Sequence, residues 1–568
     1  GLPKPTSALI TEKTALQPSF AVSHAVHTSV GSLPLLLFGT EAQQRHYLPK
    51  LTAGEYIGAY ALTEPDAGSD ALAGRTRAER MGDHYRITGN KIWITNAGFA
   101  DLFVTFAKVD GERFTAFLVE RSPGLRVERE EHKLGLHGSS TCRVVYDGVV
   151  VPAANRLGEE GEGAYVALYT LNLGRFKIGA AALGIAKEAW RIGRDYAAER
   201  KQFGHAIIEY PLIWRKLAWG ATLMYVVESA LYRLADDLEQ AFGAAGTDRQ
   251  QVWRDAAAHY AAECALIKVA ATEALHQIVD DALQIHGGYG YSEEYPIAAL
   301  YRDTRVNRIY EGTNEINRLN LVERLAYALR KGLWTPQPTG APATDTVEAT
   351  LQTLRGLCCD ALRGLAPHPE PPQPMVEPLA DALIALYLLD SAYARAQQTQ
   401  QPAHQAMVAL YHEHVRRQLA GWSADLSPLV GRAPITVEAQ PLGPARVLHA
   451  GHAQVHLVRH ASGAGGHLHR SLLWGGDHED LRAGKLLRHR DGHVPGPGWE
   501  VQQQKVQLAP VDLRDEGEEG LVQHGATPDH RLVAVHQHPH GDRTHAPPLQ
   551  GHDHMVDHRR PARNTQHP

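Results

Sequence analysis

The spacing of apolar residues changes twice along the first 330 residues of the chain. Residues 1–58 carry helical spacing, and residues 59–157 are short β-rich runs separated by Gly, Asn and Asp. Residues 158–330 return to long, Ala-rich amphipathic segments. This order predicts an α+β multidomain protein with a partial N-terminal helical domain, a central antiparallel β-barrel domain and a C-terminal four-helix bundle.

The remaining residues divide into three parts. Residues 331–346 form a Pro-rich linker, and residues 347–440 regain helical spacing and predict an appended helical domain. Residues 441–568 contain no Ile, Phe, Tyr or Cys but hold 19 of the 33 histidines. So few large apolar side chains predict disorder, or a coding region read in a non-native frame. No standard ligand spacing is present, so we expect no metal site.

Composition excludes several classes of function. The net charge of −6 provides no general attraction to nucleic acid. Four cysteines without a Cys-x-x-Cys pair indicate a reducing, intracellular compartment. No signal peptide and no apolar run long enough to cross a bilayer stand out.

Two motifs in the β-rich part combine polar and aromatic groups. In LTEPDAGSD, the residues Thr63, Gly68 and Ser69 form a polar loop that can bind a ring edge or a phosphate, although a plain turn is commoner. In KIWITNAG, Trp93 and Thr95 are two residues apart and should share one face of a strand. An indole and a hydroxyl on one face can cover a flat heterocycle, although a Trp in the core is commoner.

Three further motifs lie in the helical part. ERKQFG, residues 199–204, is typical of a helix end capped by Gly204. The glycine pair of LQIHGGYGY permits close backbone approach to a ligand, but no βαβ unit surrounds it. RIYEGTNEINR predicts a helix start with Thr313 or Asn314 as N-cap and Glu315 in the first turn, and it leaves Glu311 as a possible catalytic base.

Together, in this order, these motifs resemble the acyl-CoA dehydrogenase family, flavoenzymes that desaturate acyl-CoA thioesters. The resemblance covers residues 1 to about 329. LNLGRFKIGAAALG, RKQFG and IYEGTNEI, followed by a helical extension, resemble the very-long-chain branch. Family members begin with a longer helical domain, so the chain is expected to be truncated at its N-terminus.

The resemblance implies cofactor, substrate and partners. The expected cofactor is FAD, the substrate a long-chain acyl-CoA, and the electron acceptor an electron-transfer flavoprotein. A homodimer in the bacterial cytoplasm or the mitochondrial matrix is expected. Segments 347–365 and 375–421 are amphipathic enough for peripheral membrane association, although core packing is the commoner use of such helices.

The resemblance also implies roles for individual positions. The residues expected at the flavin are Leu62, Thr63, Gly68, Ser69, Trp93, Thr95, Thr313 and Glu315. The residues expected at the adenosine-diphosphate half of an FAD held mainly by a partner subunit are Arg200, Phe203, Gln284 and Gly288. The residues expected at the acyl-CoA are Ser69, Asn172, Arg175 and Gly312. Two positions depart from the family pattern: Pro211 replaces a common Gln, and Asn172 replaces a common Asp.

The implied chemistry requires a base, because the α-proton of a thioester is weakly acidic. Glu311 stands at the usual base position of the family, and the alternative position, just before Arg175, is Gly174. Glu311 should therefore abstract the α-proton while the flavin takes the β-hydride, and enclosure should raise its pKa. The enolate oxygen would be held by the Glu311 N–H and a flavin hydroxyl.

Three alternatives stay open at this point. The chain could be a dehydrogenase-like assembly protein of the respiratory chain with little turnover. It could be an acyl-CoA oxidase on the same fold. It could also be a fragment that does not fold stably.

Overall fold

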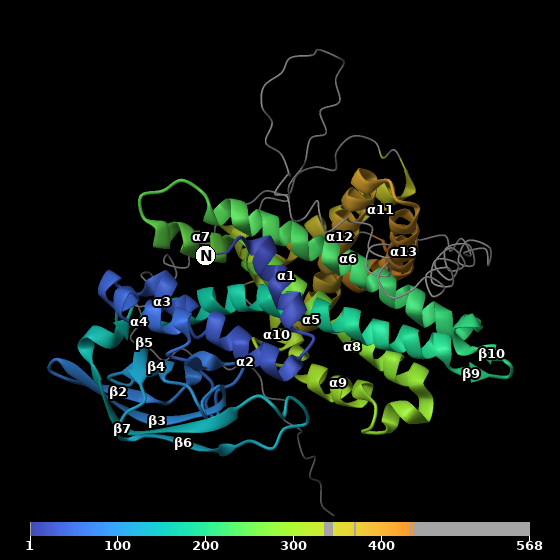
Figure 1. Cartoon of the computed structure of the whole chain (residues 1–568). Coiled ribbons are helices and arrows are strands. Elements are labelled where there is room, and N and C mark those ends of the chain that lie inside the picture. The colour runs from blue at the N-terminus through green and yellow to red at the C-terminus, as the bar shows by residue number, and fades with distance from the viewer. Residues whose placement is uncertain (1, 334–342, 344, 369–370, 432, 436–568) are drawn as a thin grey trace, which may run out of the picture. The chain divides into compact units, whose positions relative to one another are not determined.

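The computed structural model describes residues 2–333, 343, 345–368, 371–431 and 433–435 (Figure 1). The predictions for residues 441–568 and for most of the linker lie outside the described residues.

Four helices precede the sheet: α1 (Lys4–Thr14), α2 (Pro18–Thr28), α3 (Leu33–Phe38) and α4 (Glu41–Ala53). Helix α4 begins with a reciprocal capping box, because Thr40 Oγ1 accepts from Gln43 N at 3.2 Å and Gln43 Oε1 accepts from Thr40 N at 2.9 Å. It ends at Gly54, whose φ of 74° is the left-handed cap conformation. The Gln43 amide also donates to Ala154 O at 2.7 Å, which joins α4 to the sheet domain.

One stretch differs from the sequence expectation about membranes. By length and composition alone, Pro18–Phe38 is apolar enough to cross a bilayer, where we expected no such run. In the structure this stretch is divided between α2 and α3, and 39% of the tested window is buried inside the protein. A core helix of a soluble protein and a signal sequence near an N-terminus pass the same test of length and composition.

The sheet domain contains eight strands: β1 (Gly58–Ala61), β2 (Arg77–Met81), β3 (His84–Thr95), β4 (Leu102–Val109), β5 (Arg113–Glu120), β6 (Leu125–Glu130), β7 (Thr141–Pro152) and β8 (Arg156–Leu157). Their order is β6-β7-β3-β2-β4-β5-β8, with β1 also paired to β4. The pairs β1–β4 and β2–β4 are parallel, and the others are antiparallel.

The predicted central β domain is present, but two of its strand pairs are parallel rather than antiparallel. The sheet is mixed, because β3 follows β2 in the opposite direction and β4 then returns in the direction of β2. Within the described strands, no hydrogen-bonded ladder joins the end strands β6 and β8. The strands lie together in Figure 1, in blue and cyan.

The helical part contains α5 (Gly163–Glu199), α6 (Pro211–Phe242), α7 (Arg249–His259), α8 (Ala261–His286), α9 (Pro296–Thr304) and α10 (Asn314–Arg330). Helices α5, α6 and α8 pack on one another, and α10 packs on α8. Small residues allow this close packing: a Cβ added at Gly193 of α5 would lie 3.1 Å from Ala282 Cα of α8.

Short elements connect the longer ones. The 3-10 helices are η1 (Ala71–Ala73), η2 (Ala153–Asn155), η3 (Ile207–Glu209), η4 (Gly287–Tyr291) and η5 (Arg305–Arg308). A small hairpin, β9 (Lys201–Gln202) and β10 (His205–Ala206), follows α5.

Three further helices follow the linker: α11 (Thr346–Leu365), α12 (Gln373–Thr399) and α13 (Pro402–Val430). They pack on one another, and α12 also packs on α6 and α10. Their buried side chains, including Leu354, Leu389 and Val415, belong to the same apolar core as those of α5, α6 and α8. The structure therefore shows that the apolar faces of these amphipathic helices pack in the core.

Candidate active site

Glu311 lies in a short loop between η5 and α10, and the backbone of this loop is unusual. Glu311 has φ 55° and Gly312 has φ 82°, so two successive residues adopt the left-handed region. Thr313 is the N-cap of α10, and its Oγ1 accepts from Ile316 N at 3.3 Å. The predicted helix start is thus present, with Thr313 rather than Asn314 as cap. A non-glycine residue with positive φ is strained, so other groups must hold the loop.

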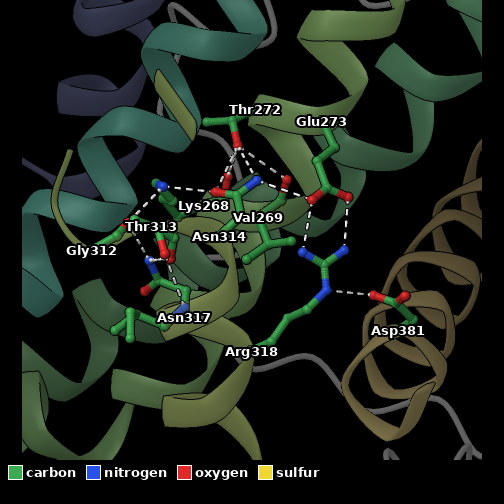
Figure 2. A network of polar contacts seen from close by, with 11 residues as sticks. Lys268, Val269, Thr272, Glu273, Gly312, Thr313, Asn314, Asn317, Arg318 and Asp381 are labelled. Atoms are coloured by element: carbon green, nitrogen blue, oxygen red, sulfur yellow. Dashed lines mark hydrogen bonds and ion pairs between the residues drawn. The ribbon is translucent and has the colours of Figure 1, made fainter. Parts of the chain in front are cut away.

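Buried donors from other helices bind the carbonyl groups of this loop. Arg175 Nε donates to Glu311 O at 3.1 Å, and Lys268 Nζ donates to Gly312 O at 2.8 Å. Asn317 Nδ2 donates to Gly312 O at 2.8 Å and to Thr313 O at 3.0 Å. Figure 2 shows Lys268 and Asn317 on either side of the loop. These bonds fix the backbone from which the Glu311 side chain projects.

The Glu311 carboxylate itself is buried without a full set of partners. Among the described residues, its Oε2 has no hydrogen-bond partner. A Cβ added at Gly174 of α5 would lie 3.1 Å from this oxygen, so the missing side chain at position 174 makes room for the carboxylate. Burial raises the pKa of Glu311 to about 7, against the positive charges of Arg175 and Lys268. A carboxylate with these properties can accept a proton near neutral pH.

The other predicted acyl-CoA residues on α5 are directed at the protein interior. Asn172 and Arg175 are 1% and 4% exposed. Arg175 Nη1 donates to Asn172 Oδ1 at 2.9 Å, and Asn172 Nδ2 donates to Ala257 O at 3.2 Å. Their observed contacts support the loop of Glu311, and a role along the CoA arm stays a prediction.

Two residues of the site were missed by sequence reasoning. The Tyr60 hydroxyl on β1 is buried and has no partner within the described chain, and burial, followed by the charge of Glu311, raises its pKa well above the ordinary value. Lys268 is 0% exposed on α8, and burial, followed by repulsion from Arg175, lowers its pKa to about 7. A lysine inside the apolar run ALIKVAA was the available signal for Lys268.

The loop after β1 is held by a buried ion pair. Lys91 Nζ lies 2.7 Å from Glu64 Oε1 and donates to Leu62 O at 3.0 Å. Ile92 N donates to Thr63 O at 2.9 Å. The loop is therefore attached to β3 at the residues just before Trp93. Farther along it, Gly68 and Ser69 are exposed.

Trp93 is 56% exposed, so it does not take the commoner place of a tryptophan in the core. Its φ is 59°, and the β3–β7 register shifts between Lys91 and Ile94, which marks a bulge. A bulge redirects a side chain that regular alternation would bury. It also interrupts the alternation that placed Trp93 and Thr95 on one face. The exposed indole beside a polar loop is a surface on which a flat ring can lie.

Strand β1 connects the two parts of this region. Burial, followed by the charge of Glu311, raises the pKa of Tyr60 on this strand, and the next residues, Leu62 and Thr63, are bonded to the strand that carries Trp93. Hydrogen bonds join the Glu311 loop to its support residues on α5 and α8, and β1 leads from Tyr60 into the loop of residues 62–69.

Four other predicted residues lie elsewhere, at the C-terminal ends of α5 and α8: Arg200, Phe203, Gln284 and Gly288. All four are exposed. Arg200 is 25 residues beyond Arg175, about 37 Å along a helix. The structure does not bring this group to Glu311 of the same chain.

The motif around Phe203 also differs from the expected helix cap. Helix α5 ends at Glu199, and Phe203 and Gly204 form the two-residue turn between β9 and β10. Both have positive φ, 52° and 85°, as a tight hairpin requires. Phe203 is consequently 93% exposed. The Arg200 guanidinium lies 5.5 Å from the centre of the Tyr289 ring.

Three family models match the sequence of the parts that hold these helices and the central sheet. The models match in succession: "Acyl-CoA dehydrogenase, N-terminal domain" at residues 1–55, "middle domain" at residues 59–149 and "C-terminal domain" at residues 161–326. The chain belongs to the acyl-CoA dehydrogenase family, which confirms the resemblance seen in its motifs.

Relatives are found in bacteria and in mitochondria. A "Probable acyl-CoA dehydrogenase" of Bacillus subtilis is 46% identical over 326 residues, covering 56% of this chain and 55% of the relative. The bovine "Very long-chain specific acyl-CoA dehydrogenase, mitochondrial" is 43% identical over 305 residues, covering 52% and 44%. The chain thus spans about half the length of these relatives.

A solved structure extends the similarity. A crystal structure of an acyl-CoA dehydrogenase complexed with FAD from Bacillus anthracis matches with a TM-score of 0.72 and 34% identity. The match covers 80% of this chain and 85% of that one, so it reaches beyond the last family model at residue 326.

Proposed function

We propose that the protein is an FAD-dependent acyl-CoA dehydrogenase that oxidises the α,β bond of a long-chain acyl-CoA, with Glu311 as the base. The observation that carries this proposal is the buried Glu311 carboxylate, whose Oε2 has no partner in the described chain and whose pKa burial raises to about 7. A structural glutamate at the start of a helix would be exposed or paired.

The residues present fit an FAD. The exposed Trp93 indole, the loop with exposed Gly68 and Ser69, and the buried proton acceptor Glu311 are features that a flavin site needs. The relative from Bacillus anthracis is described as a complex with FAD. When bound, the flavin supplies the hydride acceptor for the β-carbon. The residues proposed to hold it are Leu62, Thr63, Gly68, Ser69, Trp93, Thr95, Thr313 and Glu315.

The remaining steps belong to side chains and amides of this chain. Glu311 accepts the α-proton at its carboxylate, and the charges of Arg175 and Lys268 limit how far burial raises its pKa. Among the described residues the Glu311 N–H has no acceptor, so it is available to bind the oxygen on which enolate charge develops. Arg175, Lys268 and Asn317 keep this amide in place through the loop carbonyls.

We also propose a homodimer in which the exposed group at the ends of α5 and α8 meets the FAD of the partner. Phe203, Leu212 and Tyr291 are 93%, 75% and 89% exposed, and large apolar side chains exposed together mark an interaction surface. The proposed electron acceptor is an electron-transfer flavoprotein. The proposed location is the bacterial cytoplasm or the mitochondrial matrix, where proteins with the names of these relatives occur.

The test is anaerobic reduction of the FAD-loaded protein by palmitoyl-CoA, followed by the visible absorbance of the flavin. Glu311→Gln should slow bleaching by about 10²-fold or more, because it removes the proton acceptor. Glu263→Gln is a matched control: Glu263 is also buried, its Oε2 also lacks a partner in the described chain, and burial raises its pKa to about 8.

Each outcome decides the proposal. Bleaching that is lost in Glu311→Gln and kept in Glu263→Gln supports it. Equal bleaching by Glu311→Gln and the parent would remove Glu311 as the base. No bleaching by the FAD-loaded parent, together with recovery of respiratory-chain subunits in a pull-down, would favour the assembly protein. Rapid reoxidation of the reduced flavin by oxygen would favour the oxidase.

A further inference from the structure

A continuous series of polar contacts leads from helix α12 to the loop of Glu311 (Figure 2). It starts at Arg318 of α10, whose Nε donates to Asp381 Oδ1 of α12 at 2.8 Å. The same guanidinium makes a two-pronged contact with Glu273 of α8, at 2.8 Å and 2.9 Å. Arg318 thus joins three helices through its Nε, Nη1 and Nη2 atoms.

The series continues from Glu273 to the loop. Asn314 Nδ2 donates to Glu273 Oε1 at 3.1 Å, and Asn314 Oδ1 accepts from Lys268 Nζ at 2.7 Å. Lys268 Nζ then donates to Gly312 O at 2.8 Å, next to Glu311. Each pair of neighbouring residues in the series is therefore joined by a specific hydrogen bond or ion pair.

The donors and acceptors of the series match in only one orientation of the Asn314 amide. A carboxylate only accepts and an ammonium only donates, so Asn314 must turn its NH₂ to Glu273 and its oxygen to Lys268. A flipped Asn314 amide would place two donors against each other and two acceptors against each other. The position of Glu273 therefore fixes the orientation of the Asn314 amide, and the amide oxygen fixes the position of the Lys268 ammonium group. Arg318, which is held by Asp381, fixes the position of the Glu273 carboxylate.

We propose that Asp381 is a positioning residue for the catalytic loop, through which the appended helices α11–α13 hold Glu311 in its reactive place. This inference rests on the proposed function of Glu311. Asp381 touches neither Glu311 nor the loop. Its side chain is 33% exposed and that of Arg318 is 13% exposed, so the pair lies at the edge of the interior, where the ion pair keeps much of its strength. Without it, Arg318 can turn about its contact with Glu273.

The same helix offers a matched control in Asp390. Its side chain is 32% exposed, and its Oδ2 lies 2.7 Å from Arg233 Nη1 of α6. This ion pair attaches α12 to the bundle as the Asp381 pair does. Within the described residues its further contacts reach Arg355, Ser391 and the Tyr387 ring, and not the Glu311 loop. Asp390→Asn removes a comparable attachment of α12 while leaving the series intact.

The experiment compares Asp381→Asn, Asp381→Glu and Asp390→Asn with the parent as FAD-loaded proteins. Stopped-flow reduction by palmitoyl-CoA gives the limiting rate constant and the Kd for the thioester. Hydrogen–deuterium exchange of the peptide covering residues 309–317 gives the mobility of the loop without requiring turnover.

For Asp381→Asn we expect a limiting rate constant lower on the order of threefold to thirtyfold, the effect typical of residues that act on a site through others, with an unchanged Kd. Exchange at residues 311–317 should be faster. Asp381→Glu should recover most of the rate, and Asp390→Asn should match the parent in both rate and exchange, even if both Asn variants lower the melting temperature equally.

Equal rates and equal exchange in the two Asn variants would overturn the inference, because α12 would then contribute only stability. If the parent itself fails to bleach, the proposed function fails, and loop exchange alone decides the positioning role. Faster exchange only in Asp381→Asn would then still support that role.

Discussion

Ionisation of Glu311 should weaken the folded state, and replacement by Gln should reveal this. Burial raises the pKa of Glu311 to about 7 from an ordinary value of 4.5. The difference, about 2.5 units at about 1.4 kcal/mol each, corresponds to about 3.4 kcal/mol. Below both values the carboxyl is neutral in the folded and unfolded states, and it has no charge to bury.

The sign follows from which state holds the proton. Between 4.5 and about 7 the folded state keeps the Glu311 proton while the unfolded state has lost it, so stability falls as pH rises through this window. The Glu311→Gln variant has no carboxyl group at this position and does not lose stability in this way. Its free energy of unfolding should therefore rise relative to that of the parent by about 2.5 kcal/mol between pH 5 and pH 8. Above this range the difference between the two proteins should stay constant.

The assay is urea unfolding of parent and Glu311→Gln at matched FAD occupancy, without acyl-CoA, across that pH range. Glu315→Gln serves as the control. Hydrogen bonds from its own backbone N–H and from the Thr313 hydroxyl lower the pKa of Glu315, so its removal should cost stability at neutral pH rather than restore it. A stability difference between Glu311→Gln and the parent that does not change with pH would refute the burial argument.

Three further predictions concern other parts of the site. Gly174→Ala places a Cβ 3.1 Å from Glu311 Oε2 and should slow flavin reduction by about tenfold or more in stopped flow; an unchanged rate would place the working carboxylate elsewhere. Glu64→Gln leaves Lys91 buried and unpaired, and should cost about 3 to 5 kcal/mol in chemical denaturation, whereas a loss below about 1 kcal/mol would contradict the pairing. Phe203→Ala should leave the melting temperature unchanged but lower FAD occupancy and dimer content in gel filtration with light scattering; unchanged occupancy and mass would argue against a role at the partner's FAD.

Local patterns in the sequence predicted several parts of the site well. The cap chemistry of Thr313 depends on residues three positions apart, and the structure shows it. The alternation rule failed at Trp93, where a bulge exposes the ring, and the capping rule failed at Gly204, which turns a hairpin. In both cases the backbone adopts positive φ, a local choice that pairing with other strands decides.

The sequence by itself determined the order of helices and strands, the family and the candidate base, because periodicity, caps and motifs are properties of neighbouring residues. Only the tertiary structure decided what holds that base. Arg175, Lys268 and Asp381 come from three different helices and converge, directly or through Arg318, on one strained loop. Burial of Glu311 likewise depends on the absence of a side chain at Gly174. Contacts between residues so far apart in the chain arise from packing, which local spacing does not encode.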